Sequence, residues 1–241
     1  MEKNKLIIGN HKNYMNLNDV SKFLKKANEK INTKQVVICP SSIYIPYFIK
    51  HEYDVGVQNV EIIKPFTGEI TVSQVLELGI NYVIVGHSER LSNFYESIED
   101  INKKVIDIVS NNMKAIVCIG ETLEEKNLFK TEKALKRQIT TYFKNIPIEK
   151  MNNVIVAYEP VWTVGTGKNE TLANIKKNVT YIKELFKKVY NVDINVLYGG
   201  SINSSNIEKF NKLEEIDGFL VGEASTNIDE FLKIIEVVVN Q

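Results

Sequence analysis

The chain has few of the residues that cross-link or interrupt a protein. Its 241 residues include two cysteines, five prolines and one tryptophan. Cys39 and Cys118 each end an apolar run, and they lack the close spacing of a metal site or a redox motif. We therefore expect both to be reduced thiols in the protein core.

An excess of one charge is also missing. Thirty basic and thirty acidic side chains cancel, which gives a formal net charge of zero. No overall field would therefore draw the protein to nucleic acid or to an anionic membrane. We expect neither as a partner, and any anion site must be local.

Long apolar runs and cofactor motifs are absent as well. No run approaches a membrane span, and the start MEKNKLIIGN lacks an apolar segment of signal-peptide length, so we expect a cytoplasmic location. No dinucleotide-binding glycine fingerprint opens a helix after the first apolar run, and there is no nucleophile elbow or metal-ligand cluster. We expect no metal ion and no cofactor.

Short apolar runs recur along the whole chain. Such continuous runs are typical of parallel strands that are covered on both faces. They begin at Leu6, Val36, Val55, Tyr82, Ala115, Val154, Ile194 and Phe219. Helical patterns lie between most of them, with apolar stripes at Val20, Phe23, Leu24, Ala27 and Ile31, at Ile98, Ile101, Val105, Ile108 and Val109, and at Val179, Ile182, Leu185, Phe186 and Val189.

Eight repeats of a strand followed by a helix, in a chain of 241 residues, favour a closed (β/α)8 barrel, the TIM barrel, over an open doubly wound sheet. No linker rich in proline, glycine or serine divides the chain, and no second compositional block appears. We therefore predict a single domain over residues 1–241, of the α/β class.

Polar residues follow several of these strands, where the active site of this fold is built. Lys12, His87 and Glu159 each have an ordinary explanation when taken alone: a solvated lysine, a satisfied histidine and a capped strand end. At one barrel mouth, however, the ammonium would bind an anion, a neutral imidazole at a helix start would donate to an oxyanion, and the carboxylate would act as a general base. We predict these three as catalytic residues.

The last two strands are followed by glycine-containing turns, Gly199-Gly200-Ser201 and Gly222-Glu223-Ala224-Ser225. The loops after the seventh and eighth strands are the recurring phosphate site of this fold, where backbone N–H groups point at the ligand. The sequence therefore predicts a phosphorylated small molecule as the substrate.

Several segments, in chain order, resemble triosephosphate isomerases over essentially the whole chain. They are GNHKN, QNV, PFTGE, GHSER, CIGE, AYEPVWTVGTGK, YGGS and DGFLVGEAS. The resemblance implies interconversion of dihydroxyacetone phosphate and D-glyceraldehyde 3-phosphate, a step of glycolysis and gluconeogenesis, without a metal or organic cofactor. It also implies that Glu159 moves the proton between carbons and that His87 polarises the carbonyl.

The resemblance implies further roles around these residues. Lys12 would neutralise phosphate and enediolate charge, with Asn10 lining the site. Backbone N–H groups of four residues would bind phosphate: Gly165, Ser201, Gly222 and Glu223. Supporting residues would be Glu89, Cys118, Trp162 and Tyr198, and Pro160-Val161-Trp162 would be the first hinge of a lid that closes over the substrate.

A homodimer is also implied, in which Thr67 reaches the partner's site and Glu69 pairs with Arg90 of the other chain. His11 and Asn13 stand where the family usually has tryptophan and an apolar residue, so we expect a more polar dimer contact around them. Pro65 replaces a small residue in a third loop that is shorter than usual.

Two further departures lie near the substrate. Glu223 replaces the usual glycine, and its charge should weaken phosphate binding unless the side chain points away. The lid ends in Lys168-Asn169-Glu170, which differs from the common hinge.

Three alternatives remain open at this point. The chain could isomerise a four-carbon ketose phosphate, because its first and third loops are altered. It could be a non-catalytic phosphate-binding barrel, which would not need a base. It could also be an aldolase that forms a Schiff base with Lys12, which requires a desolvated amine.

Overall fold

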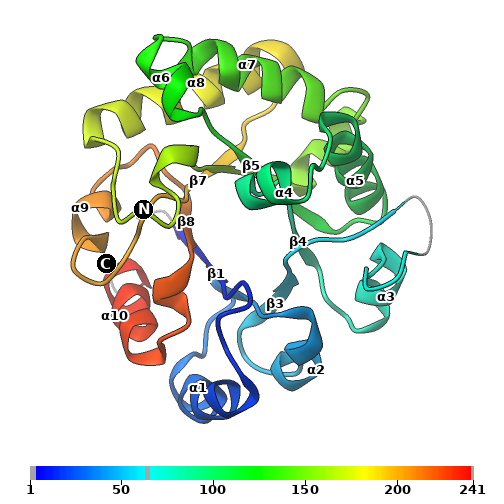
Figure 1. Ribbon diagram of the computed structural model, residues 1–241, viewed down its shortest axis with the longest axis vertical. Coiled ribbons are helices and arrows are strands. Elements are labelled where there is room, and N and C mark those ends of the chain that lie inside the picture. Colours follow the sequence, from blue (N-terminus) through cyan, green and yellow to red (C-terminus); the bar gives the residue numbers. More distant parts are fainter. Residues whose placement is uncertain (1–3, 63–65, 240–241) are drawn as a thin grey trace.

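The computed structural model describes residues 4–62 and 66–239. Parallel strands form a closed barrel in chain order, and the last strand pairs with the first (Figure 1). The strands are β1 (Leu6–Asn10), β2 (Val36–Cys39), β3 (Asp54–Val57), β4 (Tyr82–Val85), β5 (Lys114–Ile119), β6 (Val154–Tyr158), β7 (Asn195–Tyr198) and β8 (Gly218–Val221). The predicted (β/α)8 barrel is therefore confirmed.

Helices surround the barrel and connect consecutive strands (Figure 1). The α-helices are α1 (Leu17–Lys30), α2 (Ile45–Phe48), α3 (Val72–Glu77), α4 (Ser88–Asn93), α5 (Ile98–Ser110), α6 (Leu123–Asn127), α7 (Thr131–Tyr142), α8 (Leu172–Tyr190), α9 (Ile207–Asn211) and α10 (Ile228–Val239). Short 3-10 helices are η1 (Ser42–Tyr44), η2 (Ile148–Asn153), η3 (Val161–Thr163) and η4 (Glu223–Ser225). The strands β4 and β5 are each followed by two α-helices, so the repeat is less regular than its sequence pattern suggests.

The strands are apolar throughout because both of their faces are buried. Alternate residues point to opposite faces, so Ile7 and Val36 pack outward against the helices while Ile8 and Val37 fill the barrel interior. The interior cluster also contains both cysteines, which are free and buried, as predicted.

The apolar stripes of α1, α5 and α8 face the barrel as predicted, with one exception. Val189 is 45% exposed and does not belong to the core. It lies in the last turn of α8, where Tyr190 packs on Phe186 with ring centroids 5.6 Å apart and covers that part of the core instead.

The seam between β8 and β1 has no room for a side chain at Gly218. A Cβ atom built there would lie 2.0 Å from the carbonyl oxygen of Leu6, its partner in the register. Glycine is therefore required where the barrel closes.

Pro65 lies outside the described residues. Within the described ranges, none of the helices combines the length and the apolar character needed to cross a lipid bilayer.

His11 lies in the core of its own chain, which corrects the expectation that it contributes to a polar dimer contact. Only 2% of it is exposed, and its ring packs edge-on against Phe23 and Phe48, with centroid distances of 4.9 and 5.8 Å. The two phenyl rings belong to α1 and α2, so the imidazole packs between the barrel and these two helices. Asn13, by contrast, is exposed.

The burial of His11 predicts an acid-sensitive fold. Burial lowers the pKa of His11 to about 3, and the backbone of Ser225 opposes this shift only in part. The unfolded chain takes up the proton near pH 6.5, which the folded protein cannot do, so the free energy of unfolding should fall as pH drops below about 6.5. From pH 7 to pH 5 the loss attributable to His11 should be about 2 kcal/mol.

Denaturant unfolding of His11→Phe and wild type at pH 7 and pH 5 measures this effect. The variant should lose less stability on acidification by that amount. Phe48→Leu loosens the same aromatic cluster without removing a titrating group, so it should keep the pH dependence of the wild type. Equal pH dependence in His11→Phe and wild type would contradict the assignment.

Candidate active site

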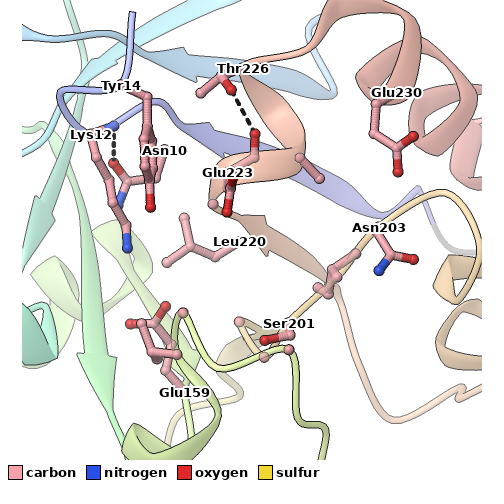
Figure 2. Close-up of a pocket in the computed structure, with 18 of the residues that line it drawn as sticks. Asn10, Lys12, Tyr14, Glu159, Ser201, Asn203, Leu220, Glu223, Thr226 and Glu230 are labelled. Carbon is pink, nitrogen blue, oxygen red and sulfur yellow. Dashed lines mark hydrogen bonds between the residues drawn. The ribbon is translucent and has the colours of Figure 1, made fainter.

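A cavity of about 470 Å³ lies at the carboxyl ends of the strands. It is lined by all of the predicted catalytic and substrate-binding residues: Asn10, Lys12, His87, Glu159, Gly165, Ser201, Gly222 and Glu223. Figure 2 shows several of these side chains around the cavity. Residues that are far apart in the sequence therefore meet at one place, as expected for strand ends in a closed barrel.

Glu159 follows β6 and is buried, and glycines on both sides make room for it. A Cβ atom at Gly120, after β5, would lie 1.9 Å from the carbonyl oxygen of Glu159. A Cβ atom at Gly199, after β7, would lie 2.5 Å from its Cγ. Because β5 and β7 are the two neighbours of β6, any side chain at these positions would displace the carboxylate.

Gln138 fixes the turn that carries Gly120. Its side-chain oxygen accepts from the Gly120 N–H at 3.0 Å, and its side-chain nitrogen donates to the Gly120 carbonyl at 2.9 Å. The sequence analysis missed this residue, because nothing about a glutamine in the middle of α7 indicates that it holds a loop after β5.

His87 is the N-cap of α4, in agreement with its predicted place at a helix start. Its Nδ1 accepts from the backbone N–H of Glu89 at 3.3 Å, so that nitrogen carries no proton. The proton of the neutral ring is therefore on Nε2, which lies 3.8 Å from Oε1 of Glu159. The Nε2–H group is the part of the ring that can donate to a ligand.

One carboxylate oxygen of Glu159 is buried without a partner in the described part of the chain. Its Oε2 is buried and meets no hydrogen-bond partner among residues 4–62 and 66–239. An unsatisfied buried acceptor is costly, and where it persists it calls for an explanation. The side chain lines the cavity, so a small rotation of the carboxylate would present this oxygen to a ligand.

Lys12 is held in a strained backbone conformation. Its φ angle is 47°, in the left-handed region that a lysine rarely adopts. The Asn10 side chain accepts from the Lys12 N–H at 3.2 Å, and the Gln58 side chain donates to the Lys12 carbonyl at 2.8 Å. Its Nζ pairs with Oε1 of Glu89 at 2.5 Å, so the ammonium is fixed beside the cavity.

Of the predicted phosphate loops, the one after β8 lies across the cavity from Glu159, and the one after β7 lies beside it (Figure 2). Gly222 precedes η4, and a Cβ atom built on it would lie 4.0 Å from Cε of Lys12, so the lysine stem runs close to this loop. Glu223 begins η4, and its side chain lines the cavity without an ion pair to any described residue. A carboxylate therefore stands where an anion is expected to bind.

Two supporting residues pack beneath the site. Cys118 is buried beside Glu159; burial raises the pKa of its thiol well above the usual value, and the negative charge of Glu159 raises it further. Tyr198 is also buried, and burial raises its pKa. A Cβ atom at Gly200 would lie 2.1 Å from the Tyr198 hydroxyl, so the tyrosine supports the phosphate loop from below.

Trp162 lies in η3, at the start of the loop after β6. Its Nε1 donates to Oε1 of the buried Glu121 at 3.3 Å, and the Tyr158 hydroxyl donates to Oε2 of the same carboxylate at 3.1 Å. Farther along, Gly165 and Gly167 have φ angles of 67° and 71°, which glycine adopts without strain.

The residues predicted to contact a second chain lie beside the cavity. Glu69 and Arg90 line an adjoining cavity of about 290 Å³, together with Lys12 and His87. Within one chain, Arg90 Nη2 is 4.0 Å from Oε1 of Glu69. Thr67 is exposed and lines neither cavity of its own chain.

A metal site would need several ligating side chains to meet within the part of the chain that the structure describes. No three histidine, cysteine, aspartate or glutamate side chains in that part of the chain are arranged so that they could hold a metal ion. The groups gathered at the cavity include the Glu159 carboxylate, an imidazole and an ammonium.

A closed (β/α)8 barrel that gathers these groups at the carboxyl ends of its strands belongs to the class of barrel enzymes. The family model for triosephosphate isomerase matches residues 5–238. The chain therefore belongs to the triosephosphate isomerase family.

Curated relatives with the name triosephosphate isomerase match along nearly their whole length. The relative from Alkaliphilus oremlandii is 38% identical over 226 residues, covering 90% of this chain and 91% of the relative. The relative from Wigglesworthia glossinidia brevipalpis is 38% identical over 251 residues, covering 99% and 98%. The relative from Mycoplasma capricolum is 35% identical over 246 residues, covering 97% and 98%.

Proposed function

We propose that the chain interconverts dihydroxyacetone phosphate and D-glyceraldehyde 3-phosphate through an enediolate, as a step of glycolysis and gluconeogenesis. The observation that carries this proposal is the distance of 3.8 Å between Oε1 of Glu159 and Nε2 of His87, inside the cavity that the phosphate loops also line. Both groups can reach adjacent carbons of a small ligand whose phosphate is held by those loops. The family to which the chain belongs supports the same reaction.

Each group has one chemical task in this proposal. Glu159 removes a proton from the carbon beside the carbonyl and returns it to the neighbouring carbon, using its carboxylate at the cavity wall. His87 donates its Nε2–H to the carbonyl oxygen and moves protons between the two enediolate oxygens. Lys12 stabilises the negative charge that develops.

The geometry of Lys12 speaks against a Schiff-base aldolase. Such an enzyme needs an uncharged amine as its nucleophile. The Lys12 Nζ is instead 2.5 Å from the Glu89 carboxylate, which stabilises the ammonium form.

The phosphate is proposed to bind backbone N–H groups of four residues: Gly165, Ser201, Gly222 and Glu223. The first of these lies in the lid, which we define as residues 160–170, and the others lie in the loops after β7 and β8. Closure of the lid would exclude water, so that the enediolate phosphate is reprotonated before it loses its phosphate.

We also propose that residues 1–241 work as one catalytic domain without a cofactor. A cytoplasmic location fits this proposal, because both cysteines are free thiols and a reducing compartment keeps them so.

A homodimer completes the proposal. The loops after the first four strands expose large apolar side chains, including Ile43 at 74%, Phe66 at 54%, Phe94 at 66% and Tyr95 at 88%. Apolar exposure of this extent is typical of a surface that binds another protein. The exposed Thr67 loop of a second copy would enter the cavity beside Glu69 and Arg90.

The catalytic assignment predicts the behaviour of two variants. Glu159→Gln and His87→Ala should each lower kcat by at least about 10²-fold, because each removes one proton-transfer group from the reaction. Turnover is measured with D-glyceraldehyde 3-phosphate in a coupled assay, with a four-carbon ketose phosphate as the comparison substrate.

Two matched controls accompany these variants. Glu77→Gln changes an exposed carboxylate in α3, and His51→Ala removes a histidine at the amino end of β3, away from the cavity; both should keep normal turnover. Near-normal kcat in either catalytic variant would refute the assignment of the catalytic residues. A preference of the wild type for the four-carbon substrate would show that the enzyme is a tetrulose phosphate isomerase.

Glu223 should oppose phosphate binding. A unit charge at about 4 Å in water contributes about 1 kcal/mol, so removing the carboxylate should lower the KM for the triose phosphate about threefold to tenfold. Glu223→Gln keeps the size of the side chain and Glu223→Gly removes it, so the pair separates charge from shape. The effect of Glu223→Gln should shrink as salt is added. An unchanged KM in both variants would show that the charge does not reach the ligand.

The dimer proposal is tested by light scattering. The wild type should have twice the mass of one chain at micromolar concentration, and Phe94→Asp should shift the population toward monomers, because it places a charge on the apolar surface. A wild-type monomer with full activity would contradict the proposal.

A further inference from the structure

One lysine contacts both ends of the lid. Lys126, in α6, forms an ion pair with Glu170, the last residue of the lid. Its Nζ also lies 3.8 Å from the centroid of the Trp162 ring, in the first turn of the lid. The ammonium of Lys126, which follows β5 and lies outside the lid, therefore contacts both hinges.

Glu170 is tightly held. Only 3% of its side chain is exposed, and its Oε1 accepts from the Thr171 N–H at 2.8 Å and from the Asn174 side chain at 3.0 Å. Burial raises the pKa of Glu170, but the hydrogen bonds from Lys126, Thr171 and Asn174 outweigh it and lower the pKa overall. The carboxylate therefore remains charged and paired at neutral pH.

Trp162 is held on a second side. Its Nε1 donates to Glu121, and the carbonyl of the next residue, Thr163, accepts from the Ser201 hydroxyl at 2.7 Å. The first hinge therefore has contacts with the loops after β5 and β7 as well as with Lys126.

The tip of the lid, in contrast, has little packing. A Cβ atom built on Gly165 or Gly167 meets no atom within 4 Å. The cavity below the lid has a volume of about 470 Å³. Cavities that bind drug-sized ligands have volumes of about 300–1,000 Å³, so this one is larger than a three-carbon phosphate requires. The tip therefore has room to move, as an open lid requires, and closure would bring it down toward the phosphate loops.

We propose that the Lys126–Glu170–Trp162 contacts form a clamp that stabilises the open lid, so that Lys126 and Glu170 are positioning residues that set how firmly a phosphate ligand is retained. This inference rests on the proposed function, which defines the lid. Lys126 lies outside the lid, so closure has to move both hinges relative to it and weaken at least one contact. Contacts made in only one of two states shift the balance between them.

The size of the effect follows from the two contacts. An ammonium over an aromatic ring and a partly exposed ion pair each correspond to a factor of about two to five in an equilibrium. Loss of both should therefore shift the lid toward closure and tighten phosphate binding about fourfold to twenty-fivefold.

The experiment compares four variants of the full chain. Lys126→Met removes the ammonium and keeps an unbranched apolar side chain, Glu170→Gln removes the ion pair alone, and Lys126→Arg keeps both contacts. Lys130→Met is the matched control, because Lys130 is an exposed lysine of the same loop and has no ion pair in the described part of the chain. Calorimetry gives the Kd for inorganic phosphate, and Trp162, the single tryptophan of the sequence, reports on the hinge through its emission.

Lys126→Met should bind phosphate about fourfold to twenty-fivefold more tightly than wild type and should change the Trp162 emission of the free protein. Glu170→Gln should have a smaller effect, and Lys126→Arg and Lys130→Met should match wild type. In turnover, kcat and KM of Lys126→Met should fall together, because opening limits product release, while kcat/KM changes little.

The inference is overturned if Lys126→Met leaves phosphate affinity unchanged or weakens it, or if Lys130→Met has the same effect. If Lys126→Met does not fold, Glu170→Gln provides the test. Tighter phosphate binding by this variant supports the clamp, and unchanged or weaker binding overturns it. Failure of the proposed function is a separate result: a wild type that does not isomerise triose phosphates refutes the reaction, while phosphate binding and Trp162 emission still test the clamp.

Discussion

The site depends on a steric constraint at three adjacent strand ends. Glu159 is buried where β6 ends because Gly120 and Gly199, on the two neighbouring strands, leave its backbone and its side chain enough room. A buried carboxylate oxygen without a partner is unfavourable, so the surrounding barrel must hold it in place. The distance to His87, the contact with Cys118 and the direction in which the lid leaves β6 all follow from that placement.

The other reactive groups are also held by specific contacts: Lys12 mainly by other loops, and His87 by the helix that it caps. The strained Lys12 backbone is fixed by Gln58 from the loop after β3, and its ammonium is fixed by Glu89 in α4. The His87 tautomer is set by a backbone N–H group of α4. These contacts restrict the orientation of the Lys12 ammonium and of the His87 ring. Such preorganisation is what catalysis by fixed dipoles and charges requires.

Much of the fold could be predicted from the sequence, because parallel strands buried on both faces produce apolar runs that are easy to identify. The candidate site followed from the fold, since polar residues after those strands converge in a closed barrel. The errors arose where a local pattern competes with tertiary packing. Val189 continues the apolar period of α8 beyond the point where the helix still faces the barrel, and His11 is polar but is drawn between two phenyl rings.

Other contacts could not have been predicted from one sequence. Gln138 and Gly120, or Lys126 and Glu170, are ordinary residues whose meeting depends on how α6, α7 and the loop after β6 pack together. Their residue types carry no signal of a contact, whereas the glycines and the strand-end charges do. Local patterns therefore gave the fold and the reactive groups, and the side chains that position those groups required the three-dimensional structure.

The seam between β8 and β1 has a consequence for how the protein is made. Leu6 is synthesised near the beginning of the chain and its partner Gly218 near the end, so β1 has an unpaired edge for most of the time on the ribosome. Pairing across such a separation is slow because a long stretch of chain must be closed into a loop. Until β8 has been made, strands that pair earlier can form only an open sheet, and its unpaired edges are exposed to pairing with other chains.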